Sequence, residues 1–217
     1  MKYYPDSQVE LQGFAARHYD TVLNTMSFGL YSGFINKAIQ AMEIKSEDKI
    51  LDLGAGTGRN AMLMSKYLSD AGKIVGLEIS DEMIQQFEQK FKDVPNITVL
   101  NKRIDKPFDL GEKFDKVFIS FVIHGFPHEV RSEVIKNAFN NLKDGGEFII
   151  LDFNEFIVKE MPLLYRKIFT TFECKYAFDY VERDWKAILS EYGFGDFSEK
   201  LFFKNYVRLL KAKKTNN

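Results

Sequence analysis

Residues 50–60 read ILDLGAGTGRN, an apolar run with glycines at every second position after it, Gly54, Gly56 and Gly58. Glycine at this spacing permits a tight turn and a close approach to a ligand, because no Cβ blocks left-handed backbone conformations or the contact. A side chain at Gly54 or Gly56 would stand where the ligand should lie. Residues able to start a helix follow at once. The stretch therefore predicts a strand, turn and helix that cradle a nucleotide-type cofactor.

The spacing of the glycines separates this cradle from two phosphate-binding patterns. The dinucleotide fingerprint G-x-G-x-x-G needs its third glycine where Arg59 stands, and Gly58 comes one residue early. The P-loop pattern that ends in Gly-Lys-Ser/Thr is absent too. A merely structural turn is the plain alternative. Two carboxylates, Asp52 before the turn and Glu78 near the end of GKIVGLEIS, count against it.

DLGAGTG at residues 52–58 resembles the first motif of class I S-adenosylmethionine (SAM) methyltransferases, DLGxGxG, in every required position. The resemblance implies a Rossmann-like α/β fold with SAM as cofactor and the glycine turn against its methionyl part. It also implies that Glu78 binds both ribose hydroxyls, a task that suits a carboxylate because it accepts two hydrogen bonds at once. SAM has no phosphate, so the helix N-terminus would serve only the methionine carboxylate.

The whole chain has the size and composition of one α/β domain over residues 1–217, with 45% hydrophobic and 28% charged residues. Thirty basic and 31 acidic residues give a net charge of −1, which predicts no nucleic-acid partner. The one cysteine, Cys174, permits no internal disulfide and suits a reducing cytoplasm. Because no secretory signal and no run of about 18 apolar residues occur, we expect a cytoplasmic protein without a membrane span. The oligomeric state stays open.

Alternating apolar runs and helical periods follow the cradle and predict a doubly wound, mostly parallel sheet. We expect strands at 49–53, 73–78, 97–100, 115–121 and 146–152, helices near 58–69, 81–92, 128–142 and 181–192, and turns at 71–72, 94–96 and 143–146. Segment 196–213 alternates apolar and polar residues around Lys204-Asn205, which predicts a closing hairpin. The count resembles the seven-stranded methyltransferase sheet with its antiparallel last strand.

Two segments lie outside that pattern. Residues 1–45 should form an N-terminal helical cap, and residues 153–180 an aromatic insertion that lies as a lid over the pocket. The rings of the insertion are Phe153, Phe156, Tyr165, Phe169, Phe172, Tyr176 and Phe178. Aromatic faces stack on a flat substrate and stabilise a sulfonium through cation–π attraction, worth about 0.5–2 kcal/mol. The alternative is that most of these rings are simply core, spaced on one helical face.

The end of the fourth strand, residues 120–126, should face the pocket, because ligands of doubly wound sheets bind at the carboxyl ends of the strands. His124 is the candidate for catalysis there, since imidazole titrates near neutrality and can take a proton from a substrate hydroxyl or ring carbon. A structural role in the pocket is the alternative, because transfer from a sulfonium needs little besides alignment. His128 lies four residues on, but Gly125 replaces the glutamate of H-E-x-x-H, so no metal site is expected.

The adenine of SAM is usually bracketed by residues after the third strand, where this chain reads NKRID at 101–105. Arg103 and Ile104 are the expected contacts of the adenine, and a shifted alignment would give this contact to Asp105 instead. The alternative is that all of these are solvated loop residues without a ligand contact. The residues expected to bind SAM are Tyr19, Asp52, Gly54, Ala55, Gly56, Gly58, Glu78, Ile79, Arg103, Ile104 and Ser120.

FAARHYDTVLNTMSFGLYSGF, residues 14–34, resembles the N-terminal region of the ubiquinone/menaquinone C-methyltransferases, with Tyr19-Asp20 and 27–29 (Ser-Phe-Gly) in matching positions. FDKVFISF (114–121), LKDGGEFIILDF (142–153) and PLLYRKIF (162–169) follow the order of that family. The resemblance implies a small, aromatic or quinone-like methyl acceptor. Tyr19 is expected to contact SAM or the substrate from a lid. Two departures concern the acceptor more than the cofactor: the Gly-Asp-Ala-like adenine motif is missing, and His124-Gly125 replaces an Arg-Asn pair.

Three functions remain open at this point. The leading one is SAM-dependent methyl transfer to a small acceptor, with transient membrane contact if that acceptor is lipid-soluble. The second is methylation of a protein or nucleic acid, against which the balanced charge and the lack of an Asn/Asp-Pro-Pro-Tyr motif count. The third is a non-catalytic module that kept the SAM cradle and lost an acceptor site.

Overall fold

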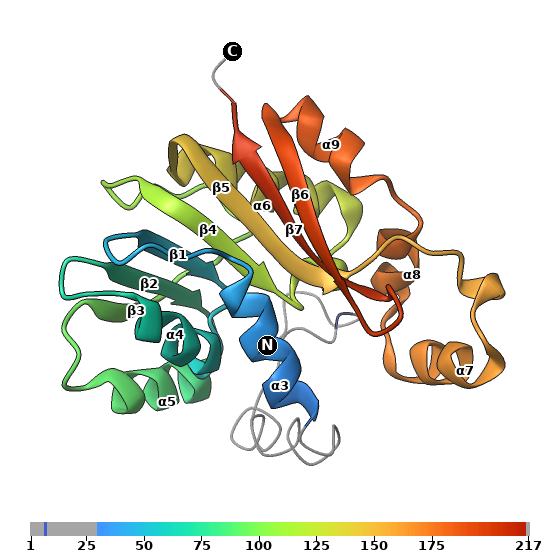
Figure 1. Cartoon of the computed structure of the whole chain (residues 1–217), viewed down its shortest axis with the longest axis horizontal. Coiled ribbons are helices and arrows are strands. Elements are labelled where there is room, and N and C mark those ends of the chain that lie inside the picture. Colours follow the sequence, from blue (N-terminus) through green and yellow to red (C-terminus); the bar gives the residue numbers. More distant parts are fainter. Residues whose placement is uncertain (1–6, 8–29, 216–217) are drawn as a thin grey trace.

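The structure is a computed structural model that describes Ser7 and residues 30–215, without the side chains of Leu30, Tyr31 and Phe172. The expected contact of Tyr19 and most of the expected N-terminal cap therefore lie outside the described residues. Within them, a central sheet is flanked by helices on both faces (Figure 1).

Seven strands form one sheet in the order β3-β2-β1-β4-β5-β7-β6. Their bounds are β1 Lys49–Leu53, β2 Lys73–Glu78, β3 Ile97–Asn101, β4 Phe114–Ser120, β5 Leu142–Phe153, β6 Phe194–Phe202 and β7 Val207–Lys214. β1 to β5 pair in parallel, whereas β7 runs antiparallel to both of its neighbours. From β1 the chain adds β2 and β3 on one side of the sheet, and it then crosses to the other side of β1 to add β4. The strand order therefore reverses between β1 and β4. Ligands bind at such a reversal in doubly wound sheets.

The helices are α3 Leu30–Gln40, α4 Arg59–Met64, α5 Asp81–Phe91, α6 His128–Asn141, α7 Leu163–Phe172, α8 Lys175–Val181 and α9 Trp185–Glu191, with 3₁₀ turns η1 Ser65–Tyr67, η2 Ile123–Gly125 and η3 Val158–Glu160. Successive residues of a strand point to opposite faces. Ile50 accordingly packs with the helices α3, α4 and α5, while Leu51 and Leu53 pack with α6, α8 and α9. Of the helices in the described part, none is long and apolar enough to cross a membrane.

The predicted doubly wound sheet and the closing hairpin are confirmed, and the bounds predicted for the first two strands agree with β1 and β2. The predicted turn at 143–146 is wrong, because these residues fall within the bounds of β5. Phe114 lies opposite Leu142 and Lys116 opposite Glu147, so the intervening residues of β5 form a bulge. In a bulge, a glycine-rich stretch stays within the strand but does not pair with the neighbouring strand. The amino-acid composition of such a stretch does not distinguish a bulge from a turn.

Candidate functional site

The glycine turn follows β1 directly and is anchored to the end of β2. The backbone N–H groups of Gly54 and Ala55 donate to the carbonyl of Leu77 at 2.8 and 3.0 Å. Gly54, Gly56 and Gly58 all lie in the left-handed region, with φ of 76°, 54° and 77°. A residue with a Cβ is disfavoured there. The turn therefore has the backbone that the spacing predicts.

The three glycines have different surroundings. A Cβ at Gly54 would stand 2.9 Å from a methyl group of Val122, and one at Gly58 would stand 2.7 and 2.8 Å from two phenyl rings of α5. At Gly56 the nearest atom would be a methionine sulfur at 3.8 Å, an ordinary contact distance. Protein packing thus disfavours a side chain at Gly54 and at Gly58, while the predicted ligand contact at Gly54 stays a prediction. Of the three, Gly56 is the one at which an added Cβ would meet no protein atom closer than an ordinary contact.

Glu78, the last residue of β2, ties the turn to the start of α5. One carboxylate oxygen accepts the N–H of Gly56 at 2.9 Å, and the other accepts those of Ile79 and Ser80 at 2.8 and 2.9 Å. An ionised carboxylate has about four lone-pair sites, so these bonds leave capacity for a further donor. The side chain therefore stands beside the open space at Gly56, where the predicted ribose would lie.

Asp52 contributes a second carboxyl group at the base of the cradle. It is 1% exposed, and its Oδ2 atom has no hydrogen-bond partner among the described residues. Burial, together with the nearby charge of Glu78, raises the pKa of Asp52 from 3.8 to about 7. A buried oxygen without a partner costs free energy unless a ligand supplies a donor. The orphaned oxygen, the space at Gly56 and the carboxylate of Glu78 all fit SAM, which carries an amino group and two ribose hydroxyls.

The loop after β3 holds the residues predicted to contact adenine. Arg103 forms a two-bond ion pair with Asp105, of which the Nε to Oδ1 bond measures 2.9 Å. Ile104 is buried, and its carbonyl accepts a hydrogen bond of 2.8 Å from Asn137 of α6. The loop is therefore fixed to the body of the protein. The adenine contact itself stays a prediction, as does the contact of Ser120 at the end of β4.

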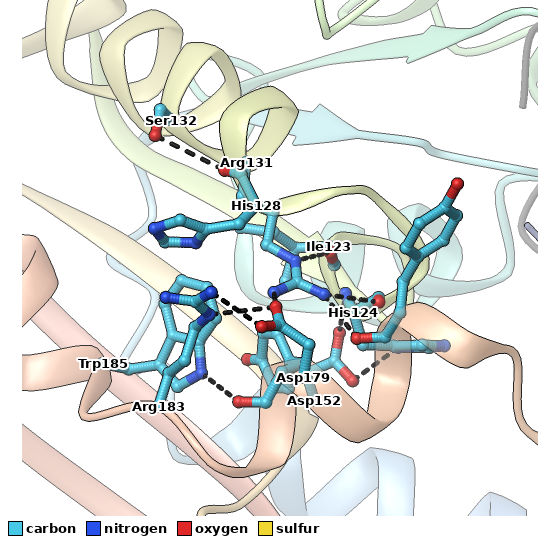
Figure 2. A network of polar contacts seen from close by, with 11 residues as sticks. Ile123, His124, His128, Arg131, Ser132, Asp152, Asp179, Arg183 and Trp185 are labelled. Atoms are coloured by element: carbon cyan, nitrogen blue, oxygen red, sulfur yellow. Dashed lines mark hydrogen bonds and ion pairs between the residues drawn. The ribbon is translucent and has the colours of Figure 1, made fainter.

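His124 lies in η2, immediately after β4, and its side chain is buried. Its Nδ1 atom is 2.7 Å from Oδ1 of Asp152, and its backbone N–H donates to the other carboxylate oxygen at 3.4 Å (Figure 2). Its Nε2 atom lies 3.6 Å from an oxygen of Glu173, between α7 and α8. Within the described residues, no group of three or more His, Cys, Asp or Glu side chains is arranged to hold a metal ion.

The two carboxylates change the acidity of His124. Burial alone would lower the pKa of His124, but the charge and hydrogen bond of Asp152, helped by the charge of Glu173, outweigh burial and raise it. Burial also raises the pKa of Glu173, and the charge of Asp152 adds to that effect. The site therefore favours a proton on the imidazole more than bulk water does.

Arg131 of α6 holds the turn that carries His124. Its guanidinium is fully buried and donates to the carbonyls of Ile123 and His124 at 3.2 and 3.1 Å. It also donates to the carbonyl of Tyr176 at 2.6 Å and pairs with Asp179 at 2.6 Å, both on α8. Figure 2 shows Arg131 between the His124 turn and Asp179. One side chain thus joins the end of β4 to the insertion that follows β5.

Aromatic rings connect His124 to α7. The ring of Phe153 lies 5.1 Å from the imidazole, and the ring of Phe169 lies 5.2 Å from Phe153, both edge to face. Phe169 in turn contacts Phe156 at 5.5 Å and Phe178 at 5.2 Å. These rings of the predicted insertion pack on one another and on the core, while the side chain of Phe172 lies outside the described part.

Sequence reasoning missed Asp152, Glu173 and Arg131. A signal for Asp152 was present, because an acidic residue at the carboxyl end of a buried strand beside β4 should lie near the residues that follow β4. The register confirms this neighbourhood, since Ser120 lies opposite Leu151. Glu173 and Arg131 carry no comparable signal, because exposed helix ends and helix surfaces commonly hold such residues.

The family described as ubiE/COQ5 methyltransferase matches residues 10–176. The demethylmenaquinone methyltransferase of Staphylococcus carnosus is 28% identical over 204 residues, covering 85% of this chain and 83% of that protein. The ubiquinone/menaquinone biosynthesis C-methyltransferase UbiE of Proteus mirabilis is 26% identical over 154 residues, covering 69% of this chain and 60% of that protein.

Solved structures show the same fold. A SAM-dependent methyltransferase from Aquifex aeolicus has a TM-score of 0.62 at 18% identity and covers 83% of this chain and 89% of its own. Human N-acetylserotonin methyltransferase, solved with SAM, has a TM-score of 0.68 at 19% identity and covers 93% of this chain and 56% of its own.

The family match includes both halves of the site, since residues 10–176 contain the glycine cradle as well as His124, Asp152 and Glu173. The geometry of the cradle fits SAM, and the fold is similar to that of solved methyltransferases. The chain therefore belongs to the ubiE/COQ5 methyltransferase family and is a SAM-dependent methyltransferase.

Proposed function

We propose that the protein transfers a methyl group to a carbon or oxygen atom of a small aromatic or quinone-like acceptor, with His124 as the base. The observation that carries the proposal is the buried pair of His124 and Asp152, which lies beside aromatic rings at the carboxyl edge of the sheet. The printed names of the relatives, which include demethylmenaquinone methyltransferase, support the acceptor class.

On the cofactor side, we assign SAM binding to the described residues of the predicted set, namely Asp52, Gly54, Ala55, Gly56, Gly58, Glu78, Ile79, Arg103, Ile104 and Ser120. When bound, SAM supplies an electrophilic methyl group on a sulfonium. The chain must then align the acceptor with that methyl group and keep water out, which together supply most of the rate.

On the acceptor side, Asp152 accepts the Nδ1 proton of His124 and so leaves Nε2 to act as the base. With a hydroxyl acceptor, the proton moves to Nε2 and an oxygen electron pair would form the bond to the methyl carbon. With a ring carbon, a π electron pair of the ring would form that bond, and the proton of the same carbon would then move to Nε2, so that its electron pair restores the aromatic ring. The sulfonium departs as a neutral thioether. Glu173 faces Nε2 at 3.6 Å, so the proton gained there is stabilised by carboxylates on both sides of the ring.

The experiment that tests the function uses methyl-labelled SAM and a lipid extract in its reduced, hydroquinone state. Label that enters an organic-soluble product supports the proposal, and Glu78→Ala should abolish it. Label that enters protein or nucleic acid would show that the methyl acceptor is a polymer and not a small molecule. Tight SAM binding without any transfer would indicate a module that binds SAM but does not methylate.

The pKa of His124 is expected to lie above its ordinary value and to fall in Asp152→Asn. The physical reason is that the carboxylate of Asp152 stabilises the imidazolium through its charge and hydrogen bond. NMR titration of labelled histidine measures this directly, because the chain has only three histidines. His128, whose pKa is lowered by burial and by nearby arginines, serves as the internal control. A His124 pKa that does not move in Asp152→Asn would remove Asp152 from its assigned role.

SAM affinity is expected to rise with pH through about 7, the pKa of Asp52. Only the ionised carboxylate attracts a cationic amino group, so binding at lower pH must first release a proton from Asp52. Calorimetry in two buffers of different ionisation enthalpy measures that proton release. In Asp52→Asn the pH dependence should disappear. If the pH dependence of SAM affinity persists in Asp52→Asn and disappears in His124→Asn, the released proton comes from His124. The assignment to Asp52 then fails.

A further inference from the structure

The outer surface of α7 and the segment before it expose several large aliphatic side chains, three on the helix and Ile157 just before η3. Leu163 and Leu164 are 76% and 69% exposed, and Ile168 and Ile157 are 49% and 55% exposed. We call these four residues the α7 patch. Single exposed apolar residues are normal on a protein surface, but a contiguous group of this kind marks an interaction site. Figure 1 shows that α7 lies at the outer edge of the molecule, away from the sheet.

Basic residues lie close to the α7 patch along the chain. Residues 157–168 contain the basic Lys159, Arg166 and Lys167 against one acidic residue, Glu160, whereas the whole chain has a net charge of −1. The tip of the β6–β7 hairpin adds Lys204, whose ammonium lies 5.2 Å from the ring centre of Tyr165 on α7. The apolar surface is therefore set in a locally positive one.

The inner face of α7 leads to the candidate active site. Phe169 is 6% exposed and contacts Phe153, which contacts His124. One helix thus carries the exposed leucines on its outer face and, on its inner face, Phe169, which contacts the ring beside the proposed base. A partner that binds the α7 patch is held next to the acceptor side of the site.

We propose that the α7 patch docks the protein on an anionic lipid bilayer, with the leucines in the boundary between headgroups and acyl chains and the basic residues near lipid phosphates. A helix of this composition lies in the membrane interface rather than across it. Anionic lipids attract each nearby Lys or Arg. A second copy of the chain fits less well, because pairing the patch with itself brings like charges together. The docking itself is independent of the proposed acceptor, but it gives a lipid-soluble acceptor a direct route to the site.

Flotation with vesicles of phosphatidylcholine and phosphatidylglycerol tests the docking, with the full chain and no acceptor present. We expect the wild-type protein to bind, and Leu163→Ser/Leu164→Ser to bind at least about tenfold more weakly. Binding should weaken with added salt and on vesicles of phosphatidylcholine alone. The matched control is Val94→Ser/Leu100→Ser, which removes two other exposed apolar side chains, 37% and 40% exposed, from the β3 end of the molecule and should bind like wild type. SAM affinity should be equal in all three proteins.

Several outcomes overturn the proposal. Wild-type protein that ignores anionic vesicles, or a double leucine variant that binds them as wild type does, removes the membrane as partner. Self-association that is lost in the leucine variant, without vesicle binding, assigns the patch to a second copy. A lower unfolding midpoint in that variant, again without vesicle binding, means that the leucines pack within the chain. Vesicle binding without any organic-soluble methylated product keeps the docking and refutes the proposed acceptor.

Discussion

Replacing Glu78 with alanine is expected to weaken SAM binding by about a hundredfold or more. A hydrogen bond from a ribose hydroxyl to the lone-pair site that Glu78 has left is worth about 1.5–3 kcal/mol, and the variant loses it. It also frees the N–H of Gly56, which donates to Glu78 at 2.9 Å, so the turn loses one of its hydrogen bonds to β2 and keeps those to the carbonyl of Leu77. Calorimetric titration with SAM measures the loss.

Two variants serve as controls for that loss. Glu78→Gln keeps an acceptor for the backbone N–H groups but has no charge, so its affinity should fall between those of wild type and alanine. Glu88→Ala removes an exposed carboxylate from α5 and should bind SAM normally. Thermal unfolding shows whether each variant is folded. Wild-type affinity in Glu78→Ala would refute the location of the cofactor site.

The cradle was predictable because its determinants are local. A tight turn needs left-handed residues, and the chain supplies glycine at each of them, with φ of 76°, 54° and 77°. β1 and β2 were predictable for a similar reason, since both are short apolar runs bounded by turn residues. The contacts that disfavour a side chain at Gly54 and at Gly58 were not predictable, because they come from residues far along the chain. Val122, far along the chain, explains Gly54, and only the packed structure shows this.

The acceptor side was less predictable because it depends on contacts between distant residues. His124 stood out by residue type, but its two carboxylates come from Asp152 and Glu173, 28 and 49 positions later. No periodicity connects positions so far apart. The bulge in β5 is a similar case, since its glycines predict a turn and the pairing of Glu147 with Lys116 decides otherwise. Sequence alone thus indicates which residues can react, and the sheet order determines which of them meet.

Arg131→Met is expected to lower the free energy of unfolding by about 3–5 kcal/mol, because each buried carbonyl that loses its donor costs about 1–3 kcal/mol. The guanidinium is 0% exposed and satisfies carbonyl oxygens of the His124 turn and of α8, so its loss leaves buried acceptors without donors. Asp179 contributes less to the cost, because it is half-exposed and keeps Arg183 as a partner at 2.7 Å. Urea unfolding measures the change.

Arg131→Lys separates the charge of Arg131 from its shape. The guanidinium lies 5.2 Å from the ring centre of Tyr180 and 5.7 Å from that of Trp185, and its fork serves several acceptors at once. A lysine keeps the charge but offers neither the planar stacking nor the fork, so we expect it to recover less than half of the lost stability. The NMR signal of His124 should shift in both variants, because the arginine holds the carbonyl of that residue at 3.1 Å. Wild-type stability and an unmoved His124 signal in Arg131→Lys would show that charge alone holds the turn in place.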